Sequence, residues 1–352
     1  CCQWVHACLS NRSRYARYVT GETQTHRFHY AWVVFVAAFI TLVGAAGFRS
    51  APGVLINPLH EEFGWGRGTV GTAVSINVIL YGLVGPFAAA LQLRFGLRRV
   101  TMASLAIIST GALLTTRMHS PWQLFLLWGV IVGVGSGCMA TVFASTVASR
   151  WFVRHRGIVT GALTAASASG QLVFLPVLAS LAKHHGWRSV SLTIAVSATA
   201  VIPVVFLLLR NSPADMGLLP VGAPDDFRPP SVIGNPVATA FGALRDARRD
   251  HVFWLLWGSF LVCGLSTNGL IGTHFLSAAG DHHLSETTAA GYLALIGGFD
   301  VAGTIASGWL TDRIDPARLL TGYYFFRGAS LLFLDPALNA RGMGLMGFMI
   351  FY

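Results

Sequence analysis

Long apolar stretches alternate with short polar loops along almost the whole chain. A membrane-spanning helix needs roughly 20 apolar residues. A tenth stretch, 342–352, is shorter than that. Because the stretches are continuously apolar and do not alternate residue by residue, a closed β-barrel is excluded. The pattern predicts an all-α polytopic membrane protein with nine complete transmembrane helices and part of a tenth. The nine stretches are 30–58, 69–93, 99–117, 121–148, 157–182, 188–209, 252–279, 287–311 and 318–338.

Two polar segments divide this pattern into regions. Residues 1–28 have no apolar core and are therefore not a signal peptide. Residues 210–250 are polar and proline-rich, and they separate six apolar stretches from the rest. We expect a short amphipathic helix on the inner surface at ALRDARRD, residues 243–250. The predicted regions are a cytoplasmic leader (1–28), a six-helix half (29–209), a cytoplasmic inter-half loop (210–250) and an incomplete second half (251–352).

Composition and charge agree with a membrane protein. Hydrophobic residues make up 54% of the 352 residues and charged residues 11%, which excludes a soluble globule and a disordered chain. The 24 Lys and Arg outnumber the 14 acids, but they sit in loops between apolar stretches, so nucleic acid is not expected as a partner. With the N-terminus inside, 17 of them fall on the inner side and 5 on the outer side. The bias predicts a multi-pass protein of the inner or plasma membrane with a cytoplasmic N-terminus.

The chain contains an internal repeat. The loop after the second stretch, AALQLRFGLRR (89–99), superposes on the loop after the eighth, GWLTDRIDPAR (308–318), at an offset of 219 residues. The same offset carries Tyr81 onto Asp300. Parallel halves that repeat in this way are typical of secondary transporters.

The segment GWLTDR (308–313), with its degenerate copy LRFGLRR (93–99), resembles the loop signature of the major facilitator superfamily. The signature implies a tight inner turn and a carboxylate that caps the next helix. The first copy has Ala89 and Leu93 where the signature has Gly and Asp, and the second has Asp315 where it has a second Gly. The residues to which the resemblance gives a structural or gating role are Arg94, Arg98, Gly308, Asp312 and Arg313.

Four longer segments resemble the monocarboxylate-porter and oxalate/formate-antiporter branch of that superfamily. The resemblance implies a twelve-helix transporter of small organic anions that works by alternating access, with proton coupling as an option. Helices eleven and twelve and most of ten would then be absent here. Since alternating access needs two complete halves, residues 1–352 alone are not expected to transport. The segments are EEFGWGRGTVGTAVSIN (61–77), RWFVRHRGIVTGALTAASASGQLVFLP (150–176), HHGWRS (184–189) and RNSPADMGLLPVGA (210–223).

Ionisable residues at membrane depth are costly and usually functional or paired. Arg49 is a candidate ligand for a substrate carboxylate, and the alternative is snorkelling to the outer headgroups. Asp300 could carry a coupling proton, or it could form a structural pair with Arg327. Related monocarboxylate carriers have an acid here with an Arg one turn later, where this chain has Thr304. For Arg327 itself, packing or pairing with Asp300 is the expected role.

Other polar groups in the apolar stretches are weaker candidates. His274 could relay protons or could be a hydrogen-bonded structural residue. Several side chains could line a substrate cavity, and helix–helix hydrogen bonding is the alternative for each. They are Asn77, Tyr81, Ser167, Gln171 and Asn268, the last being the repeat mate of Arg49.

Signals of other chemistry are weak. GSGCMA (135–140) fits a dinucleotide pattern but lies in an apolar helix without a preceding strand, so we interpret its glycines as a packing face. There is no Walker A loop, GxSxG or HExxH motif. We therefore expect no enzyme, cofactor or metal, and a monomer whose partners are the bilayer and a small anionic solute. An efflux carrier of other solutes and a non-transporting membrane sensor remain alternatives.

Overall fold

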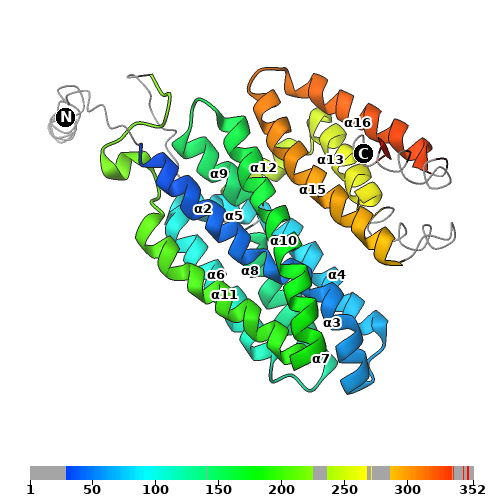
Figure 1. The fold of residues 1–352 in the computed structure, drawn as a ribbon. Coiled ribbons are helices and arrows are strands. Elements are labelled where there is room, and N and C mark those ends of the chain that lie inside the picture. Colours follow the sequence, from blue (N-terminus) through cyan, green and yellow to red (C-terminus); the bar gives the residue numbers. More distant parts are fainter. Residues whose placement is uncertain are drawn as a thin grey trace, which may run out of the picture.

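The computed structural model describes residues 29–139, 141–224, 236–267 and 286–334, together with positions 271, 336, 344, 347 and 348. Every regular element in these residues is a helix, and an isolated β-bridge joins Phe152 to Val221. The helices form two groups that lie side by side (Figure 1).

The first group contains most of the buried apolar side chains, including Phe143, Trp151 and Trp187. It is formed by the helices from Ala31 to Leu208. Its helices are α2 (Ala31–Ala45), α3 (Gly47–Phe63), α4 (Arg67–Leu83), α5 (Gly85–Phe95), α6 (Leu97–Thr115), α7 (Pro121–Leu124), the π-helix η1 (Phe125–Val132), α8 (Gly133–Gly137), α9 (Thr141–Trp151), α10 (Arg156–His185) and α11 (Trp187–Leu208).

The second group packs against the first mainly through α10 and α15, which make the most extensive helix–helix contact in the described residues. Figure 1 shows α15 running along α10, with α13 and α16 on its far side. The remaining helices are η2 (Pro213–Met216, a 3-10 turn), α12 (Pro236–Ala247), α13 (His251–Gly264), α15 (Glu286–Thr311) and α16 (Pro316–Leu332).

Two stretches that the sequence predicts as continuous are broken. The first divides into α2 and α3 at Ala46, where the chain is tightly packed: a Cβ on Gly170 of α10 would lie 2.5 Å from the Ala46 side chain. The second divides into α4 and α5 at Val84 with a bend of 51°. Pro86 follows at the start of α5, and a proline there removes a backbone donor and clashes with the preceding turn.

The fourth stretch is also irregular, because its middle is the π-helix η1 rather than a regular α-helix. The glycines that follow are a packing face, as the sequence predicts. A Cβ on Gly133 would meet the backbone of α4 at 3.2 Å, and one on Gly137 would meet the Val84 side chain at 2.7 Å. On the other side, a Cβ on Gly135 would lie 2.9 Å from Ile108 of α6. Glycine thus lets three helices approach closely.

Several of the described helices have the length and apolar composition of membrane spans. In the described residues, four helices are long and apolar enough to cross a membrane, and a fifth crossing results if the bent pair α4–α5 is one span. Two shorter apolar helices are Ala31–Ala45 and His251–Thr267. The total of nine complete spans stays a prediction.

The inter-half loop contains the expected helix, but α12 begins at Pro236, seven residues earlier than the ALRDARRD segment. It packs against α5, where the rings of Phe241 and Phe87 meet edge to face with centroids 5.3 Å apart.

Candidate functional site

The two helical groups come closest at the end of the bundle that the charge bias predicts to be cytoplasmic, here called the inner end. At this end α10 crosses α15 at glycines from both helices. A Cβ on Gly157 would lie 2.3 Å from the Gly308 carbonyl oxygen, and one on Gly161 would lie 2.7 Å from that of Thr304. A Cβ on Gly308 would in turn lie 2.4 Å from the Gly157 oxygen. Since no side chain fits between them, the two backbones touch directly.

The Asp312 carboxylate crosses from one group to the other at this point. Its Oδ1 accepts a hydrogen bond of 2.7 Å from the Gly157 N–H, and its Oδ2 accepts one of 3.1 Å from the Ile158 N–H. These amides belong to the first turn of α10, where the N–H groups have no hydrogen-bond partners within the helix. The preceding residue, His155, supplies no side-chain cap. Asp312, in the turn after α15, therefore caps α10 from the other helical group, and its charge faces the positive end of the α10 dipole.

This arrangement corrects one sequence-based expectation. The GWLTDR signature implied that its carboxylate, Asp312, caps the next helix. In the structure that helix, α16, is capped by Asp315, whose Oδ1 accepts from the Ala317 and Arg318 N–H groups at 2.9 and 3.2 Å. Asp315 is the residue that departs from the signature. Because it takes over the local capping, Asp312 is available for α10. We term Gly157, Ile158, Gly161, Gly308 and Asp312 the inner contact.

The other signature residues lie close to their own helices. The Arg313 guanidinium is 3.6 Å from the centroid of the Trp309 ring, and that of Arg94 is 5.6 Å from Phe95. Arg98 lies 4.3 Å from the Phe206 ring of α11, within the first group. In the described residues, the degenerate first copy of the signature therefore makes contacts within the first group. The second copy joins the two groups.

Asp300 lies on α15 and Arg327 on α16. Arg327 donates hydrogen bonds to Cys263 Sγ at 3.3 Å and to Thr267 Oγ1. Cys263 lies in the last turn of α13, and Thr267 follows that helix. Its charge also acts on the Asp300 carboxylate, but no ion pair within 4.0 Å joins the two among the described residues. Asp300 is solvent- or lipid-exposed in this arrangement.

The predicted cavity residues lie in different places. Asn77 is buried on α4 and donates a 2.8 Å hydrogen bond to the Trp128 carbonyl, which is the helix–helix role that the sequence left open. Tyr81, one turn further along α4, is half-buried against the core. Ser167 is half-buried on α10.

The structure describes the remaining candidate residues only in part. Arg49 lies in α3 and Gln171 in α10, but the side chains of both fall outside the described residues, as do Asn268 and His274 entirely.

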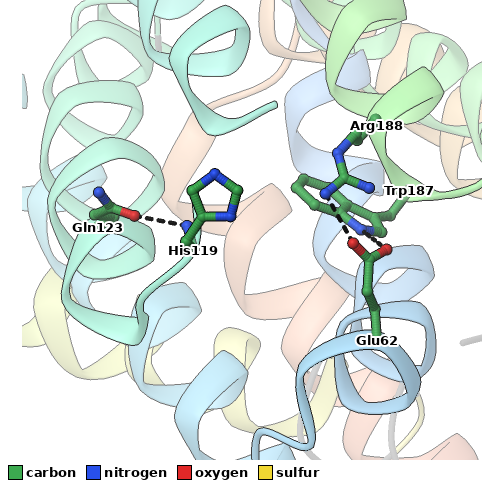
Figure 2. A network of polar contacts seen from close by, with 5 residues as sticks. All are labelled: Glu62, His119, Gln123, Trp187 and Arg188. Carbon is green, nitrogen blue, oxygen red and sulfur yellow. Dashed lines mark hydrogen bonds and ion pairs between the residues drawn. The ribbon is translucent and has the colours of Figure 1, made fainter. Parts of the chain in front are cut away.

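At the opposite, outer end a polar network joins α3 to α11 (Figure 2). Glu62 accepts hydrogen bonds from the Trp187 indole N–H at 2.6 Å and from Arg188 Nη2 at 2.7 Å. Partial burial raises the pKa of Glu62, but the bonds from Arg188 and Trp187, the Arg188 charge and nearby His119 lower it by more. The carboxyl therefore has a pKa below its usual range.

Sequence reasoning missed this network and the partner of Asp312. For the inner contact a signal was present, because Gly157 and Gly161 are four residues apart and form the GxxxG pattern of close helix crossings. For the outer network the residues fall inside segments that resemble known transporters, but nothing in their spacing pairs Glu62 with Trp187 or Arg188.

The comparisons with known proteins agree with this architecture. The chain belongs to the Major Facilitator Superfamily, whose family profile matches residues 33–352. Against a solved structure of the proton:xylose symporter XylE the TM-score is 0.61, at 15% sequence identity, with 92% of this chain and 78% of that chain covered. Against the fucose:proton symporter FucP of E. coli it is also 0.61, at 15% identity, over 92% and 81% of the two chains.

Relatives by sequence include bacterial and human transporters. YcxA of Bacillus subtilis, an uncharacterized MFS-type transporter, is 26% identical over 295 residues, which cover 84% of this chain and 68% of YcxA. Human monocarboxylate transporter 11 is 26% identical over 306 residues, covering 86% of this chain and 61% of that protein. Human monocarboxylate transporter 7 is 28% identical over 159 residues, covering 45% and 30%. This chain thus spans about two thirds or less of their lengths. The resemblance inferred from the sequence is confirmed.

Proposed function

We propose that the protein is a secondary transporter of small organic anions that works by alternating access, with the inner contact as its inner gate. The observation that carries this proposal is the Asp312 carboxylate, which bonds the free amides of α10 across the boundary between the two groups. The monocarboxylate transporters among its relatives support the anionic substrate class.

The inner contact has the strength that a reversible gate requires. A side-chain cap of a helix N-terminus contributes about 0.5–2 kcal/mol, and a charge near the helix dipole about 0.3–1 kcal/mol. Such a contact biases the equilibrium toward the closed inner end but lets thermal motion or substrate binding open it. The glycine crossing adds close packing that is lost when α10 and α15 separate.

Substrate recognition falls to Arg49 in this proposal, since its planar guanidinium can grip a carboxylate with two hydrogen bonds. It lies in the third residue of α3, just after the break at Ala46. Tyr81, Gln171 and Asn268 are the further candidates for contact with the solute. The protein is expected to act as a monomer in the bilayer, without a cofactor.

Counterflow of a labelled monocarboxylate in proteoliposomes, using the full-length gene product, tests the proposal. We expect exchange in the unmodified protein and a loss of affinity in Arg49→Lys equivalent to about 1.5–3 kcal/mol, because a point charge does not replace the planar fork. Arg117→Lys, in an outer loop, is the matched control. Exchange of neutral or cationic solutes in place of monocarboxylates would overturn the substrate class, and unchanged affinity in Arg49→Lys would assign Arg49 to headgroup contact.

A further inference from the structure

The chain that follows α11 turns back under the inner end of the first group. Residues 209–223 form this segment, which we term the inner strap. Figure 1 shows it in yellow-green beside the N-terminal end of α2. The strap has local order of its own: Pro213 is buried, η2 forms one 3-10 turn, and the Asp215 carboxylate accepts from the Ser212 N–H at 3.1 Å.

Several inner ends of the first group are attached to the strap. Asn211 accepts from the Arg98 N–H through its Oδ1 at 3.0 Å and from Arg150 Nη1 through its backbone oxygen at 3.0 Å. The Leu219 oxygen lies 3.1 Å from His29 Nε2, before α2. The strap thus connects the starts of α2 and α6 with the end of α9.

The most specific attachment is a short parallel bridge to the turn between α9 and α10. The Val221 N–H donates to the Trp151 oxygen at 2.9 Å. The Val221 oxygen accepts from both the Val153 N–H at 2.9 Å and the Arg154 N–H at 3.1 Å. The backbone of this turn therefore finds its hydrogen-bond partners in a segment about 70 residues away in sequence.

The turn ends in an unusual backbone conformation immediately before α10. His155 has φ +66°, and in the described residues no other non-glycine residue has a positive φ. A side chain in this region is unfavourable and persists only where the surroundings hold it. Gly222, with φ +77°, lies against the turn: a Cβ there would be 2.5 Å from Arg154 Cβ. The strap therefore fits the turn only because residue 222 is a glycine.

We propose that the inner strap positions the first turn of α10 for Asp312, with Val221 and Gly222 as the positioning residues. The link is short. Gly157 and Ile158, which donate to Asp312, follow His155 by two and three residues. A change in the His155 backbone would turn both N–H groups away from the carboxylate. The positioning role concerns only the inner contact and does not depend on the proposed gating role. Its consequence for transport rests on that proposed function.

Amide hydrogen exchange across the first turn of α10, in the purified protein in nanodiscs, tests it. These amides have no partner within the helix, so their protection reports the Asp312 contact. We expect Gly222→Ala and Asp312→Ala each to speed exchange at Gly157 and Ile158 by about fivefold, the equivalent of a lost cap of about 1 kcal/mol. The matched control is Gly217→Ala, also in the strap and at φ +70°, where a Cβ meets nothing within 4 Å. It is expected to leave exchange unchanged.

A rescue variant separates positioning from a general loss of structure. If the strap acts by holding His155 in its left-handed conformation, His155→Gly, which adopts that conformation without strain, should restore slow exchange in Gly222→Ala. Failure of the rescue would overturn the proposal. Should Gly222→Ala not fold, Val221→Pro replaces it, because it removes one donor of the bridge and leaves the carbonyl.

The outcomes separate the positioning role of the inner strap from the gating role of the inner contact. Faster exchange in Asp312→Ala but not in Gly222→Ala would overturn the positioning role and leave the gate intact. Faster exchange in both variants with unaltered counterflow kinetics would support positioning and overturn the gating role of the inner contact.

Discussion

At the scale of single residues, Asp300 has two alternative roles, proton coupling and a structural pair with Arg327. It lies in the middle of the apolar stretch 287–311, and its repeat mate Tyr81 lies in the first half. Arg327 acts on it electrostatically but is hydrogen-bonded to Cys263 and Thr267. Both of these partners are neutral. Among the described residues no ion pair within 4.0 Å joins Asp300 to Arg327, so the coupling role and the structural pair are separated by experiment.

We expect Asp300→Asn to abolish uphill, proton-driven accumulation while exchange persists, because the amide cannot carry a proton between the two sides. Uptake and counterflow in the same proteoliposomes measure the two activities. Asp315→Asn, an acid in the loop before α16, serves as the control. A fall in expression that the double change Asp300→Asn with Arg327→Gln repairs would instead indicate a structural pair.

Glu62 provides a pH-dependent prediction at the outer end. Its folded pKa is lowered, so the stability that it contributes is fully present above its unfolded value of 4.5 and is lost as the pH falls through the lower folded value. Both partners are more than a third exposed, so the Arg188 pair is worth at most about 1 kcal/mol. Thermal unfolding in detergent should show Glu62→Gln less stable than the parent at pH 7 and equal to it below the folded pKa. Glu61→Gln is the neighbouring control, and an equal loss there would contradict the assignment.

At the scale of elements, the crossing of α10 and α15 depends on glycine. A Cβ on Gly308 would meet the Gly157 backbone oxygen at 2.4 Å, and a backbone atom cannot rotate away. We expect Gly308→Ala to cost about 1–3 kcal/mol in the closed arrangement, as overpacking does. The distance between spin labels at Arg99 and Arg318, on exposed sites of the two groups, should lengthen.

The matched control lies on the same helix. A Cβ on Gly303 meets nothing within 4 Å, so Gly303→Ala is expected to leave the label distance unchanged. Equal distances in Gly308→Ala and Gly303→Ala would show that the glycine crossing does not hold the two groups together.

At the scale of the whole molecule, the orientation in the membrane follows from the distribution of Lys and Arg rather than from the fold. The bias of 17 to 5 predicts that the N-terminus and residues 210–250 face the cytoplasm. A protease site placed at residues 225–230 should therefore be cut in inside-out vesicles and resist cleavage in intact cells. Cleavage from outside intact cells would reverse the topology, and with it the assignment of the inner end.

The sequence by itself determined that the chain is helical, that it crosses a membrane and which superfamily it belongs to. In lipid the backbone must satisfy its own hydrogen bonds, so an apolar stretch of sufficient length has to be a helix. Local chemistry also marked the close approach at Gly133 and Gly137. The tertiary structure alone decided which helix Asp312 caps, because its partners are more than 150 residues away and Asp315 competes for the local role. The same reason applies to Val221 and the turn before α10: a hydrogen bond between distant backbones leaves no periodicity in the sequence.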